Sequence, residues 1–127
     1  MKLIMTSIIA LLVANSSFAD ESKQVEKVVA INDVLISGSF STNQEATVVV
    51  SGLFPNGCYS WKEDRVEHKS EFLHEVRAIA LVYQGMCIMA LKPFTKVVGF
   101  GQLNSGQHTL RFFNGDGTYQ ERVIRVD

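Results

Sequence analysis

Residues 108–126, HTLRFFNGDGTYQERVIRV, contain the pattern that decides the fold. In HTLRFF at the start of this stretch and in RVIRV at its end, successive residues alternate between two faces, as they do in a strand with one buried face. Leu110 and Phe112 share one face of the first run, and Ile124 and Val126 share one face of the second. Between the runs, Asn-Gly-Asp-Gly at 114–117 supplies residues that tolerate a positive φ in a tight connection. The stretch therefore predicts an antiparallel β-hairpin.

The same period-two pattern extends back along the chain to about residue 27. Short runs of apolar and β-branched residues are separated by Gly, Pro, Asn and Ser, which favour turns. The runs lie at residues 27–37, 46–51, 58–62, 75–83, 86–91, 96–103, 108–113 and 119–126. About seven to eight short strands at this spacing indicate an all-β protein, an antiparallel β-sandwich or barrel.

Residues 62–77, KEDRVEHKSEFLHEVR, do not follow the pattern as clearly. Too few apolar residues are present for the buried face of a helix. We expect a strand end, a polar loop around residues 68–71 and a strand that resumes near Phe72, with a short helix as the alternative. The acidic side chains of this segment are expected to form a solvated face.

Residues 1–19, MKLIMTSIIALLVANSSFA, have the organisation of a cleavable secretory signal peptide. Lys2 supplies a positive charge, and residues 3–14 are apolar except for Thr6 and Ser7. Ser17 and Ala19 are the small residues expected before a cleavage site. The apolar stretch is too short to span a bilayer, which needs roughly 20 residues. We therefore predict a periplasmic or secreted protein without a membrane span, with a flexible N-terminus at 20–27 and a β-sandwich domain at 28–127.

The charge of the expected mature chain bounds its partners. Without the leader, 11 basic residues face 13 acidic ones, a net charge of −2. A chain that is nearly neutral and contains no basic run lacks the electrostatic footprint of a nucleic-acid-binding protein. We expect no nucleic-acid partner.

Cys58 and Cys87 are the two cysteines of the chain. In an oxidising compartment such a pair is expected to form a disulfide. The alternative is a reactive or metal-binding thiol, but the separation of the two residues does not match a C-x-x-C motif.

Several short motifs follow one another in a recognisable order. Residues 52–58, GLFPNGC, are followed by a second cysteine, Pro-Phe, Val-Val-Gly, a leucine, a glycine and Asn-Gly; these are Cys87, Pro93-Phe94, Val97-Val98-Gly99, Leu103, Gly106 and Asn114-Gly115. This order resembles small bacterial exported domains with an immunoglobulin-like β-sandwich fold and no assigned activity. The resemblance covers roughly residues 46–127. It implies an immunoglobulin-like sandwich with a Cys58–Cys87 bridge, and it carries over no catalytic residue.

The sequence contains no recognised catalytic or metal-binding motif. A G-x-S-x-G nucleophile motif is absent. Met86, Cys87 and Met89 have the soft sulfur atoms that Cu(I) prefers, but no histidine occurs between Cys87 and His108. On a strand, Met86 and Met89 point to opposite faces, so we expect one in the core and the other at an edge or turn. We predict no enzyme activity, no metal ligand and no cofactor.

Tyr59 and Trp61 are the candidate contacts for a ligand or partner, because aromatic residues at i and i+2 share one face of a strand. The alternative is that both fill the core between the sheets. The sequence thus favours a non-catalytic binding module for a protein or cell-envelope component. A small inhibitor of a hydrolase, acting through a surface loop such as residues 62–71, is the second hypothesis; an enzyme or a copper carrier is the third.

Overall fold

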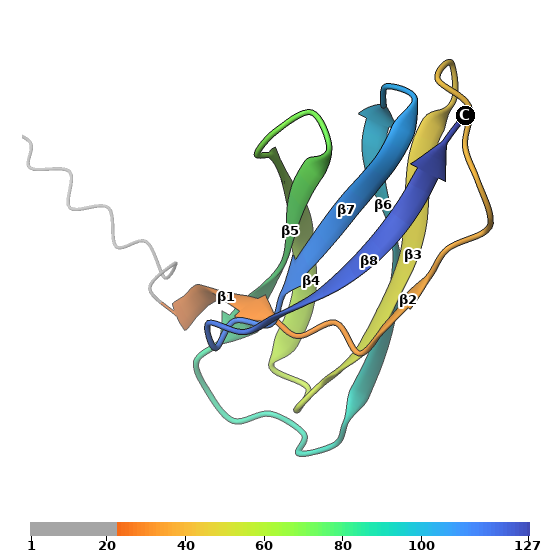
Figure 1. The fold of residues 1–127 in the computed structure, drawn as a ribbon. Coiled ribbons are helices and arrows are strands. Elements are labelled where there is room, and N and C mark those ends of the chain that lie inside the picture. The colour runs from red at the N-terminus through yellow and green to blue at the C-terminus, as the bar shows by residue number, and fades with distance from the viewer. Residues whose placement is uncertain (1–22) are drawn as a thin grey trace, which may run out of the picture.

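The computed structural model describes residues 23–127, which form two β-sheets facing each other (Figure 1). The eight strands are β1 (Gln24–Val29), β2 (Asp33–Leu35), β3 (Glu45–Phe54), β4 (Tyr59–His68), β5 (Leu73–Tyr83), β6 (Lys92–Gln102), β7 (Gly106–Phe113) and β8 (Tyr119–Val126). The predicted β-sandwich is confirmed. The predicted signal peptide lies outside the described residues. Within residues 23–127 no helix is long and apolar enough to cross a membrane.

The larger sheet is built around β5. One edge of β5 pairs with β4. The other edge pairs with β7 at residues 73–76 and with β1 at residues 78–83, and β7 in turn pairs with β8. The smaller sheet has the order β2-β3-β6. All strand pairs are antiparallel except β5 and β7, which are parallel. That exception follows from the connectivity. The chain leaves β5, runs through β6 in the other sheet and returns as β7. It reverses direction once before β6 and once after it, so β7 runs in the same direction as β5.

The core lies between the sheets and uses alternate residues of each strand, as the sequence pattern predicts. In the C-terminal hairpin, β7 and β8 pair from Gly106 with Val126 to Phe113 with Tyr119. Leu110 and Phe112 are fully buried there. Their partners across the core include Val48, Val50, Val98 and Phe100 of the smaller sheet.

Residues 62–77 form a strand hairpin and no helix. β4 continues to His68, a tight turn follows, and β5 begins at Leu73, so the expected polar loop and resuming strand are confirmed. The pairing of β4 with β5 is interrupted by a β-bulge between Trp61 and Glu63. Because a bulge inserts one extra residue, the positions of β4 that face the core change from odd to even numbers.

Two predictions about strand positions are wrong. Residues 86–91, expected to form a strand, belong to the loop between β5 and β6, and β6 instead begins at Lys92. Residues 20–27, expected to be flexible, contain the start of β1, because Gln24–Val29 pairs with β5 from Tyr83 to Ala78. The polar side chains of β1 lie at the outer edge of the larger sheet and remain exposed, which hides the strand from an analysis of hydrophobic periodicity.

Candidate interaction site

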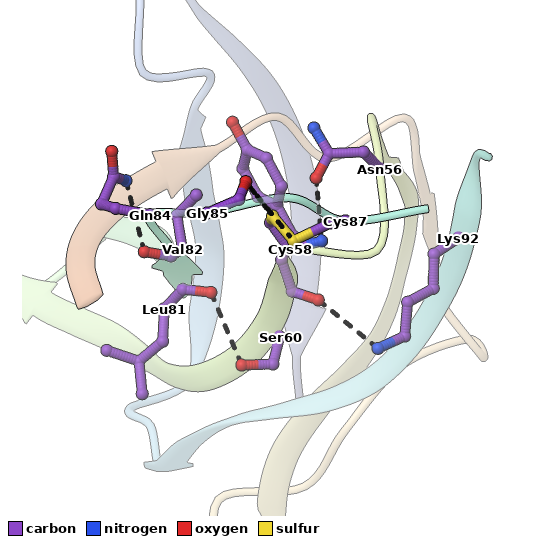
Figure 2. Close-up of a disulfide and its surroundings, with 10 residues drawn as sticks. Asn56, Cys58, Ser60, Leu81, Val82, Gln84, Gly85, Cys87 and Lys92 are labelled. Carbon is purple, nitrogen blue, oxygen red and sulfur yellow. Dashed lines mark hydrogen bonds between the residues drawn. A yellow bond between two sulfur atoms is a disulfide. The ribbon is translucent and has the colours of Figure 1, made fainter. Parts of the chain in front are cut away.

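A disulfide between Cys58 and Cys87 links the turn before β4 to the loop at residues 84–91 (Figure 2). The two Cα atoms are 5.3 Å apart, which lies within the usual range for a disulfide. The Gly57 N–H donates to the Ile88 carbonyl oxygen at 2.8 Å, and the Tyr83 N–H donates to the Cys58 carbonyl oxygen at 3.0 Å. Backbone hydrogen bonds and a covalent bond therefore hold the loop against the end of the sandwich. We call residues 84–91 the linked loop.

The linked loop exposes four large apolar side chains. Met86 is 101 % exposed, Met89 83 %, Ile88 79 % and Leu91 66 %. Clustered apolar exposure on a folded protein is typical of an interaction surface, because water disfavours it and nothing in the fold compensates. Methionine adapts its shape to a partner more readily than branched residues do.

Tyr59 and Trp61 lie next to the linked loop, at the start of β4, and both pack against the core while remaining partly accessible. The Tyr59 ring stacks on Phe54 with centroids 5.8 Å apart, and the Trp61 ring lies 5.5 Å from that of Phe94. Core filling, the alternative to ligand contact, accounts for most of their environment. The remaining exposed edge of Trp61 keeps it available as a contact residue.

That edge of Trp61 borders a groove of about 300 Å³ between two edge strands, β4 and β6. The other residues that line the groove are Phe54, Lys92, Pro93, Phe94, Thr95 and Lys96. Lys92 Nζ donates to the Tyr59 carbonyl oxygen at 3.4 Å (Figure 2), and Lys96 Nζ lies 5.9 Å from the centre of the Trp61 ring. The groove is thus aromatic on its floor and positively charged at its rim.

The sequence pattern did not predict that Met86 and Met89 would both be exposed. We expected Met86 or Met89 in the core, and this is wrong because both lie on the linked loop. The useful signal is that MCIMAL is apolar without alternation and contains a cysteine. A strand with one buried face alternates, whereas a loop held by a disulfide can keep apolar residues exposed. The disulfide also occupies the thiol that a soft-metal site around Cys87 would need.

The acidic residues of β4 and β5 form ion pairs on the outer face of the larger sheet. Glu63 pairs with Arg65, and Glu67 pairs with Lys69 at 3.1 Å. Hydrogen bonds from Lys62 and Arg65 lower the pKa of the Glu26 carboxyl on β1. Glu63 and Glu67 form a solvated, charge-balanced face, as the sequence predicts for them. The prediction is wrong for Glu75, which is only 6 % exposed and whose carboxylate lies 3.4 Å from Arg111 Nη1 and 3.8 Å from Arg77 Nη1.

Comparison with protein families finds a match. The family model described as the ORF11 beta-sandwich domain matches residues 48–125, from within β3 to within β8. The matched segment includes the disulfide, the linked loop and the groove. Comparisons with curated proteins and with solved structures find no match.

Proposed function

The chain belongs to the ORF11 beta-sandwich domain family, and from that premise we propose that it is a non-catalytic interaction module, exported to the periplasm or secreted, that binds a protein or cell-envelope component. The contact surface in this proposal consists of the linked loop and the neighbouring groove. Tyr59 and Trp61 pack against the core next to this surface, and Trp61 contributes its exposed edge to it.

The observation that carries the proposal is the exposure of four large apolar side chains on a loop that a disulfide and a backbone hydrogen bond hold at Cys87 and Ile88; they are Met86, Ile88, Met89 and Leu91. Full burial of one such side chain stabilises a complex by about 1.5–3 kcal/mol. The disulfide limits the conformations of the loop before binding, so less entropy is lost when a partner orders it. An exposed apolar surface that is already ordered is suited to binding.

Export is supported by two features of different kinds. Residues 1–19 have the charge, apolar stretch and small residues of a signal peptide. The Cys58–Cys87 disulfide is of the type that persists in oxidising compartments.

A hydrolase inhibitor is the second candidate. Residues 62–71, the loop first considered for this role, belong mostly to β4 and its tight turn. The linked loop replaces it, since a rigid loop with exposed apolar side chains is what an inhibitor inserts into an enzyme cleft. Stoichiometric loss of hydrolase activity on mixing would favour this candidate over a structural binding partner.

The proposal is tested with Ile88→Glu, which places a charge at the centre of the linked loop. Leu35→Glu is the matched control, because Leu35 is 64 % exposed on β2, outside the loop. A photo-crosslinking residue at position 86 should join the wild-type chain to one partner in envelope extracts of the source organism. Ile88→Glu should abolish that product and Leu35→Glu should preserve it. Equal crosslinking in both variants would contradict the proposed surface.

A further inference from the structure

All three histidines of the chain meet at the end of the sandwich opposite the linked loop. Cys58 directly precedes β4 and His68 ends it, so the strand separates the two sites by about 30 Å. Figure 1 shows the turn between β4 and β5 at one end of the molecule and the loop between β5 and β6 at the other. The histidine cluster is therefore a site separate from the linked loop.

The histidines form one hydrogen-bonded chain across three strands. His68 and His74 are cross-strand partners in β4 and β5, and their Nδ1 atoms are 2.6 Å apart. His74 Nε2 lies 2.8 Å from Nδ1 of His108 on β7, and His108 Nε2 lies 2.7 Å from the Asn104 carbonyl oxygen. His74 and His108 are 1 % and 0 % exposed, whereas His68 is exposed.

The carbonyl at the end of this chain determines where the protons lie. A carbonyl oxygen only accepts, so His108 donates from Nε2 and accepts at Nδ1 when its ring is neutral. His74 must then donate from Nε2, which leaves the lone pair of its Nδ1 directed at His68. A buried imidazole whose far nitrogen is held by a hydrogen bond is the arrangement found behind metal-ligating histidines.

The same hairpin supplies a carboxylate. His68, Glu71 and His74 line one pocket of about 210 Å³, and Glu71 is the single acidic residue among those that line it. The Asn104 side-chain amide donates to Glu71 Oε1 at 2.9 Å. Asn104 thus orients the Glu71 carboxylate through its side-chain amide. Its backbone carbonyl orients His108, and His108 in turn orients His74.

We propose that His68 Nδ1, His74 Nδ1 and the Glu71 carboxylate bind one divalent transition-metal ion of the Zn²⁺ type. Two imidazoles and a carboxylate are a ligand set that Zn²⁺ accepts, with water as a fourth ligand. Binding releases no net proton, because the proton on His68 Nδ1 is lost to solvent while His68 Nε2, which faces the exposed side, takes one up. His68 thus exchanges one neutral tautomer for the other.

Binding requires two small movements. Within residues 23–127 no three histidine, cysteine or carboxylate side chains already stand in a ligating arrangement. Zn–N bonds of about 2.0–2.1 Å in a tetrahedral site place two nitrogens roughly 3.3 Å apart, so the two rings must separate slightly. His68 can move, since it is exposed and ends a strand, whereas packing holds His74. Glu71, in the turn, must rotate toward the nitrogens.

The test is a calorimetric titration of the EDTA-treated mature chain, without an affinity tag, with ZnCl₂. One equivalent should bind to the wild type. His68→Ala and Glu71→Gln should each weaken the affinity at least tenfold, and Glu67→Gln, an exposed carboxylate of β4 outside the pocket, should leave it unchanged. His108→Gln should weaken the affinity roughly 10–100-fold, because it removes the support of His74.

An independent readout avoids relying on variants of buried residues. In ¹H–¹⁵N correlation spectra of the imidazoles, Zn²⁺ should shift Nδ1 of His68 and His74, and the His68 proton should appear on Nε2. Absence of binding by the wild type, wild-type affinity in His68→Ala or Glu71→Gln, or unchanged Nδ1 signals would each overturn the proposal.

Discussion

His74 shows how strongly its surroundings change a single side chain. Burial of the ring, with smaller contributions from His68 and His108, lowers the pKa of His74 from its ordinary value of 6.5 to about 4. The charged imidazole would lose water without gaining a carboxylate, and it would break the hydrogen-bonded chain. The folded protein therefore keeps His74 neutral at pH values where the unfolded chain protonates it.

This difference predicts a pH dependence of stability in metal-free protein. Between pH 6.5 and about 4 the unfolded state binds more protons, so the free energy of unfolding should fall as the pH falls through this range. One such group contributes a slope of at most about 1.4 kcal/mol per pH unit. Urea denaturation at pH 7, 6 and 5 measures how the free energy of unfolding changes with pH. His74→Gln should flatten the slope, and a wild-type stability that is constant from pH 7 to 5 would contradict the prediction.

The β-bulge in β4 links both sites at the scale of a single element. Before the bulge, Tyr59 and Trp61 face the smaller sheet; after it, Val66 and His68 do. A regular strand would continue the odd-numbered pattern of Tyr59 and Trp61, and it would place Val66 and His68 on the outer face. The extra residue in β4 is thus what brings His68 to His74.

The linked loop should depend on its disulfide. The double variant Cys58→Ser/Cys87→Ser opens a covalent loop that joins residues 29 positions apart. The chain-entropy model predicts a loss of roughly 3.5 kcal/mol in the free energy of unfolding, measured by urea denaturation. Limited proteolysis should also cleave the variant within residues 84–91 before the wild type, and equal resistance would show that backbone hydrogen bonds alone hold the loop.

For the whole molecule, the testable prediction concerns processing. Cleavage of the signal peptide after Ala19 should yield a mature chain that begins at Asp20. Intact-mass spectrometry of the exported protein should give that chain, lighter by two hydrogen atoms than the reduced sequence. An uncleaved N-terminus or free thiols in the undenatured protein would contradict export or the disulfide, respectively.

Local patterns accounted for part of the fold and of the site. The hairpin at residues 108–126 was predictable because alternation and turn residues act within a few positions of one another. Tyr59 and Trp61 were placed on one face of a strand for the same reason. The loop at 84–91 was not, because a short apolar run has the same composition in a buried strand and in a loop held by a disulfide.

The sequence by itself determined the fold class, the C-terminal hairpin with its turn at residues 114–117, and the two residues of the disulfide, since each depends on composition or on neighbours along the chain. Only the tertiary structure decided that β1 pairs with β5, that β5 and β7 run parallel, and that the bulge turns His68 inward. These depend on which strands pair across long separations and on a register that one extra residue can shift. For that reason three scattered histidines meet in a single chain of hydrogen bonds, an arrangement that their spacing in the sequence does not indicate.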